Sequence, residues 1–140
     1  MKIFTPNTVI ASADMNLNFS GIDTRVATLE AQVVRHNVGA TNEPAYQNGW
    51  TNYNAPWNNC FFTKSVDGMV TVNVMTKSGT WGSVIFTLPV GFRPGVQISV
   101  PAYSPGGACF ADISTTGTIN TEGGSNNAYL MFNATFKAEN

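Results

Sequence analysis

The sequence predicts a mainly β protein with one N-terminal helix, arranged as a trimeric coiled-coil stalk followed by a β-sandwich, jelly-roll-like head. Two patterns predict this class. Apolar residues recur at alternating spacings of four and three in the first quarter of the chain, and short alternating segments separated by turn residues fill the rest. We therefore expect an N-terminal arm over residues 1–11, a stalk helix over 12–38 and a head domain over 39–140.

The stalk helix is expected to begin after Ser12, a favourable N-cap, and to end before Gly39, which tolerates a left-handed backbone. Its apolar seam consists of Met15, Phe19, Ile22, Val26, Leu29, Val33 and His36. The stripe is narrow and has polar flanks, which favours self-association over the alternative, packing on the chain's own sheet. The heptad rules leave the number of strands open, but an aromatic core layer at Phe19 fits more easily into a parallel trimer.

The head is expected to contain seven or so short strands, because apolar and polar residues alternate between turn dipeptides such as Asp67-Gly68 and Ser78-Gly79. Pro89 and Pro94 bracket a loop that cannot continue a β ladder. The expected strands cover residues 60–65, 69–76, 81–88, 96–100, 108–114, 118–121 and 128–137.

The composition excludes several classes of function. The net charge is -1 and charged residues make up only 11% of the chain, so nucleic-acid binding is not expected. No apolar run reaches the length of a membrane span, and no secretion signal is visible, so we expect assembly in a cytosol without membrane insertion. Cys60 and Cys109 are expected to be buried thiols, with a disulfide between them as the alternative.

Catalysis has little support, and we expect no cofactor, no metal and no enzymatic activity. His36 is the only histidine and falls in the predicted seam, away from any strand-borne serine. Three His36 rings in a trimer could hold an anion or a metal, but we expect a frayed, hydrated last layer. An acid/base pair for glycoside hydrolysis would have to be Asp112 with Glu122, and nothing in the sequence sets their separation.

Binding is better supported, because aromatic residues lie among amide side chains after residue 45. Aromatic faces stack on sugar rings and amides pair with hydroxyl groups, so this mixture suits saccharides. The alternative for each ring is a place in the core, which we expect for Trp50 and Trp81. The candidate ligand-binding residues are Trp57 and Tyr103, in loops flanked by proline, together with Tyr53 and Asn127.

Four segments resemble one known group of proteins. Residues 82–94 (GSVIFTLPVGFRP) resemble a strand and Leu-Pro turn motif in the head domains of bacteriophage tail fibres and receptor-binding proteins. Residues 47–54 (QNGWTNYN) and 126–138 (NNAYLMFNATFKA) are similar to the opening and closing strands of those domains. Residues 8–19 (TVIASADMNLNF) are similar to the start of short phage-fibre coiled coils.

The resemblance implies a homotrimeric virion component of the phage tail that adsorbs to a host cell-surface or cell-wall saccharide without covalent chemistry. It also implies that the N-terminal arm attaches to another tail or baseplate protein, and that Arg93 is structural. Two other functions stay open: a structural virion protein whose head binds another virion protein, and an enzyme that degrades the host glycan.

Overall fold

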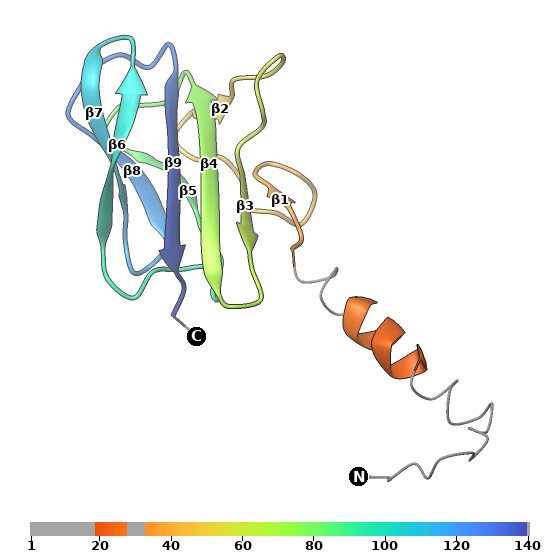
Figure 1. The fold of residues 1–140 in the computed structure, drawn as a ribbon. Coiled ribbons are helices and arrows are strands. Elements are labelled where there is room, and N and C mark those ends of the chain that lie inside the picture. The colour runs from red at the N-terminus through yellow and green to blue at the C-terminus, as the bar shows by residue number, and fades with distance from the viewer. Residues whose placement is uncertain (1–18, 28–32, 140) are drawn as a thin grey trace, which may run out of the picture. The chain divides into compact units, whose positions relative to one another are not determined.

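The computed structural model describes residues 19–27 and 33–139 (Figure 1). The chain divides into two compact units, Met1–Gln32 and Val33–Asn140. Every strand among the described residues lies in the second unit, which we call the head, and the described part of the first unit is a helix over residues 19–27.

The described helix carries three residues of the predicted seam. Phe19, Ile22 and Val26 are all exposed, with Phe19 exposed to 64% of its maximum. Met15 and Leu29 lie outside the described residues, as do the predicted arm and the predicted start of the stalk helix. Its predicted end, residues 33–38, is described and is not helical. Val33 is exposed and precedes the first strand of the head. The coiled coil therefore stays a prediction.

The expectation that His36 belongs to the stalk helix is wrong. His36–Asn37 forms strand β1, antiparallel to β3 (Phe61–Lys64), with His36 opposite Phe62. The imidazole stacks on the Phe62 ring with centroids 4.8 Å apart, and its Nδ1 lies 2.9 Å from Oε1 of Glu43. Val38 is buried in the core of the head. His36 fits the helical spacing, but its contacts with Phe62 and Glu43 place it in the head. The head therefore begins before Gly39.

The described residues of the head form nine strands, and the seven predicted ones correspond to β3 to β9. The two outside that set, β1 and β2, are only two residues long, and β2 lies within the segment that resembles an opening strand. The remaining strands are β2 (Thr51–Asn52), β4 (Met69–Lys77), β5 (Val84–Thr87), β6 (Ile98–Ser104), β7 (Gly107–Ile113), β8 (Thr118–Glu122) and β9 (Leu130–Lys137).

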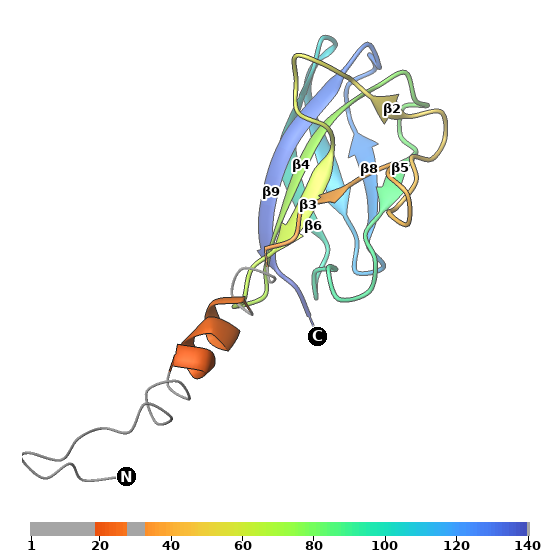
Figure 2. The same cartoon turned by 90° about the vertical axis from the view of Figure 1, so that its right-hand side faces the viewer.

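The strands form one sheet in the order β1-β3-β4-β9-β6-β7-β8-β5, and β2 also pairs with β4. Within the described chain, β9 and β6 share a single pair of partners, Tyr103 and Met131, and the sheet turns there. As a result β5 and β8 lie behind β4 and β9 (Figures 1 and 2). The structure confirms a mainly β head, but its two layers belong to one curled sheet.

The core lies between the two layers. Val70, Val72 and Val74 point inward from β4, and the alternate residues of β4 point outward, as the pattern predicted. Trp50 is 2% exposed, which confirms that it is structural. Cys60 and Cys109 are both buried and both free, so the expectation of buried thiols is confirmed.

The free edge of β5 is covered by the segment that leads into β2. The amide of Gln47 donates to the Ile85 carbonyl at 2.8 Å, and the side chain of Asn48 donates to the Val84 carbonyl at 2.8 Å. These bonds satisfy edge groups that would otherwise be open to another strand.

Candidate functional site

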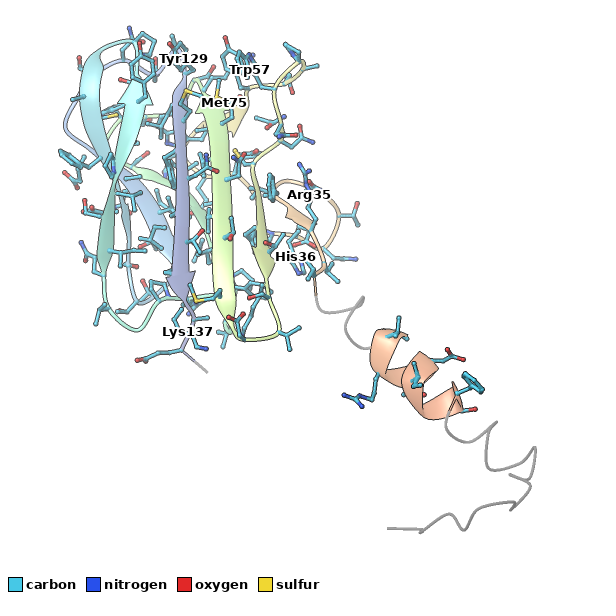
Figure 3. The ribbon with its side chains drawn as sticks, viewed as in Figure 1. Arg35, His36, Trp57, Met75, Tyr129 and Lys137 are labelled. Atoms are coloured by element: carbon cyan, nitrogen blue, oxygen red, sulfur yellow. The ribbon has the colours of Figure 1, made fainter. Side chains whose placement is uncertain are left out.

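The two ends of the head differ. His36 and Lys137 lie toward one end, whereas Trp57, Met75 and Tyr129 lie at the other, which we call the distal end (Figure 3). Because β1 is antiparallel to β3 and His36 pairs with Phe62, the residues before His36 run beside Lys64. The chain therefore enters the head from the end opposite Trp57.

Trp57 stands on the loop between β2 and β3, and its side chain is 52% exposed. The loop is held by Asn52, whose Nδ2 donates to Oδ1 of Asn59 at 2.6 Å. Oδ1 of Asn52 in turn accepts the amide of Cys60 at 3.2 Å. The amide of Trp57 donates to the carbonyl of Asn54 at 3.3 Å. A half-buried polar anchor thus supports an exposed indole.

A hollow of about 160 Å³ lies between this loop and the outer face of β4 and β9. Its floor comes from two pairs of directly opposed residues, Asn73 with Asn133 and Met75 with Met131. The complete lining consists of Trp57, Asn58, Asn73, Val74, Met75, Met131, Phe132 and Asn133, with no charged side chain. The hollow therefore offers an indole, amides and thioethers to a ligand.

The two floor amides bind each other, since Nδ2 of Asn73 donates to Oδ1 of Asn133 at 2.6 Å. They occupy outward positions that alternate with the inward valines of β4 and the inward Phe132 and Ala134 of β9. The strand period of two places these amides on the surface and gives both a fixed backbone support.

Three tyrosines gather beside the hollow. The Tyr129 ring lies 5.9 Å from that of Tyr53 and 6.0 Å from that of Tyr103, and Nζ of Lys77 lies 5.4 Å from the Tyr53 centroid. Desolvation, together with a hydrogen bond to Tyr103, raises the pKa of Tyr129 above that of an ordinary tyrosine. Met131 connects this cluster to the hollow, because its partner on β6 is Tyr103.

The structure brings three of the four candidate ligand-binding residues together. Trp57, Tyr53 and Tyr103 all belong to the distal end, and Tyr103 is 55% exposed. Tyr103 lies on β6 and not in a loop, because β6 continues through Pro101 to Ser104.

Asn127 is two residues before Tyr129, at the same end of the head, but its hydrogen bonds are made within the chain. Its Nδ2 donates to the Gly79 carbonyl at 2.7 Å, and its own carbonyl accepts the amide of Ser78 at 2.8 Å. Asn127 therefore holds the turn after β4.

Sequence reasoning missed the residues of the floor. Asn73 was visible as an outward residue of its strand, but its partner Asn133 lies sixty positions further along the chain. Only the pairing of β4 with β9 makes them neighbours. Trp81, expected to be structural, is half-buried, and its Nε1 donates to the carbonyl of Gly123 at 2.5 Å.

Asp112 and Glu122, the potential acid pair, lie diagonally on the outer face of β7 and β8. Asp112 is opposite Asn120, Glu122 is opposite Phe110, and Oδ2 of Asp112 accepts from Gln97 at 3.3 Å. Among the described residues, no group of three or more histidines, cysteines and acids is placed to bind a metal. Within the same residues, no helix has the length and apolar character needed to cross a membrane.

No protein-family model matches the chain, and no curated protein matches it by sequence. The structure is similar to the crystal structure of the receptor binding protein (gp15) of Listeria phage PSA, with a TM-score of 0.61 and 15% identity. The match covers 96% of this chain and 90% of that one. At 15% identity, this similarity is evidence for a shared fold alone. The chain thus has the β fold of a phage receptor-binding protein, which agrees with the resemblance in its sequence motifs.

Proposed function

We propose that this protein is a receptor-binding protein of a phage tail that attaches to a host cell-surface saccharide without covalent chemistry. The observation that carries the proposal is the distal hollow, in which the exposed Trp57 stands over an uncharged floor of amides and thioethers. The similarity of fold to a phage receptor-binding protein supports the same role.

The chemistry of the hollow suits a sugar. An indole face stacks on the apolar face of a pyranose ring, while amide groups pair with its hydroxyl groups. The neighbouring Tyr53, Tyr103 and Tyr129 extend the aromatic surface beyond the hollow and add phenol groups that donate and accept. A longer glycan can therefore contact the hollow with one unit and the tyrosines with the next.

We further propose that three chains associate through the helical seam and present three distal ends in parallel. The exposed Phe19, Ile22 and Val26 support this arrangement, since an aqueous environment does not stabilise an uncovered apolar stripe. Three equivalent weak sites bind a repetitive surface far more strongly than one. The arm over residues 1–11 would attach to another tail or baseplate protein. The protein would assemble in the host cytosol and act on the virion.

The test is binding of the purified full chain to a glycan array and to bacterial cell-wall preparations. We expect binding to glycans, and a loss of at least about tenfold in Trp57→Ala. Val66→Ala is the matched control, because Val66 is an equally exposed apolar residue in the turn between β3 and β4, away from the hollow. Absence of glycan and cell-wall binding, with no effect of Trp57→Ala, would contradict the proposal.

The second candidate is a structural protein whose head binds another virion protein. It is favoured by the outer face of β6 and β7, where Phe110 is 50% exposed and lies opposite Pro101, next to the pair of Tyr103 and Ala108. Exposed apolar patches of this kind commonly form protein interfaces. If Phe110→Ser abolished binding to tail proteins while Trp57→Ala left adsorption unchanged, this second function would replace the first.

A further inference from the structure

The two amides on the floor of the hollow leave complementary groups unused. With Nδ2 of Asn73 bound to Oδ1 of Asn133, the remaining groups are an acceptor, Oδ1 of Asn73, and a donor, Nδ2 of Asn133. Neither makes another hydrogen bond within the described part of the chain. If both amides are turned over, one acceptor and one donor again stay free, so the complementarity does not depend on that choice.

The walls around these amides are apolar. Met75 and Met131 are directly opposed on β4 and β9, one step along the strands from the amide pair on the same face, and Trp57 stands above them. Thioether side chains adapt their shape to small apolar groups. A ligand group that fits must therefore combine one donor, one acceptor and a small apolar end.

The hollow also selects by size and charge. At about 160 Å³ it is smaller than the roughly 300–1,000 Å³ of sites that enclose a drug-sized ligand, so it suits one sugar unit or less. Its lining has no charged side chain, so a phosphate or carboxylate would lose hydration without gaining a charged partner.

We propose that the hollow binds the acetamido group of an N-acetylated hexosamine. The acetamido carbonyl accepts from Nδ2 of Asn133, a neighbouring ring hydroxyl donates to Oδ1 of Asn73, the methyl group packs against Met75 and Met131, and the ring stacks on Trp57. A plain hexose offers hydroxyl groups at the same place but no methyl group. This inference rests on the proposed function and names the class of sugar that the distal end selects.

The probes are N-acetylglucosamine, N-acetylgalactosamine and N-acetylmannosamine, each compared with its parent hexose, added to the full chain. Binding is followed by the shift of the Trp57 indole NMR signal and by saturation transfer to the ligand protons. We expect at least one N-acetylated sugar to bind at least about tenfold more tightly than its parent hexose, with the strongest transfer to the acetyl methyl group.

Asn133→Asp is the decisive variant. The new carboxylate can still accept from Nδ2 of Asn73, so the internal bond and the fold are retained, but the donor to the ligand is lost. Asn42→Asp is its control, because it adds the same charge at an exposed left-handed turn residue (φ 64) outside the hollow. We expect loss of N-acetyl sugar binding in Asn133→Asp and none in Asn42→Asp.

The possible failures are distinguishable. Equal binding of N-acetylated and parent sugars, or Asn133→Asp binding like the native chain, overturns the acetamido inference and leaves glycan adsorption standing. If only glycans without acetamido groups bind on the array, and Trp57→Ala abolishes that binding, the acetamido inference is likewise overturned and glycan adsorption stands. Absence of all glycan binding overturns the proposed function as well.

Discussion

Gly79 lies directly against the indole of Trp50: a Cβ built at residue 79 would stand 2.0 Å from Cδ2 of that ring. Trp50 is buried in the core of the head, so the ring is held by the residues around it. We expect Gly79→Ala to lower the free energy of unfolding by about 1–3 kcal/mol, as overpacked cores do. Thermal or urea unfolding measures this. Gly21→Ala, at a helical position with nothing within 4 Å, is the control and should leave the stability of the head unchanged.

Because of Cys60, the head is expected to become less stable at alkaline pH. Burial raises the pKa of its thiol above the ordinary 9.0, and the thiol binds the backbone of Met75 in both directions, at 3.2 and 3.3 Å. The unfolded chain therefore loses this proton at a lower pH than the folded one. The stabilisation is complete below the ordinary thiol pKa and is lost as the pH rises toward the raised value.

We therefore expect unfolding midpoints to fall above about pH 9, and less steeply in Cys60→Ala. Tyr46, whose pKa is also raised mainly by burial, adds to the fall at higher pH in both proteins. An identical pH dependence in the two proteins would show that Cys60 does not contribute.

Self-association is tested at Ile22, which occupies the middle of the described helix and is exposed. We expect a mass near three chains in sedimentation or light scattering, and dissociation in Ile22→Asp, because a carboxylate in an apolar seam loses its hydration. Ser20→Asp adds the same charge outside the seam and should keep the trimer. A native chain that is monomeric at micromolar concentration would rule out the stalk.

Asn127 is expected to stabilise the fold without contacting the glycan. Its Nδ2 donates to the Gly79 carbonyl, so Asn127→Asp would place a carboxylate against that carbonyl. We expect a loss of about 1–3 kcal/mol in unfolding free energy, since the carbonyl of the buried Gly79 is left without its donor. Glycan affinity measured well below the unfolding temperature should stay within about twofold of the native chain. A large loss of affinity in a fully folded variant would instead make Asn127 a ligand contact.

The strands that could be predicted from the sequence are those in which apolar residues alternate locally between turn residues. Val70, Val72 and Val74 alternate with Met69, Thr71 and Asn73 over the first part of β4. Asp67-Gly68 supplies a turn with φ 81 at the glycine. Strands β1 and β2 are too short to alternate, so their conformation depends on partners elsewhere in the chain. His36 fitted the helical spacing, but its stacking on Phe62 depends on the tertiary fold.

In the candidate site, too, some residues could be predicted from a local pattern and others depend on the tertiary fold. The exposure of Trp57 could be predicted because it lies in a proline-flanked, amide-rich loop that has no strand pattern. Tyr103 was also expected to be exposed, but its position on β6 was missed because Pro101 normally interrupts a ladder. The floor of the hollow depends on the register between β4 and β9, which a single sequence does not contain.

The alternation of β4 has a consequence for how such a protein changes over generations. Val72 and Val74 hold the core, while Asn73 between them faces the hollow on the opposite side of the same strand. Replacing an outward residue removes few core contacts, so its effect on folding is small compared with its effect on recognition. Under the proposed function, a population carrying this head can therefore acquire new binding specificities one substitution at a time, at positions where most variants still fold.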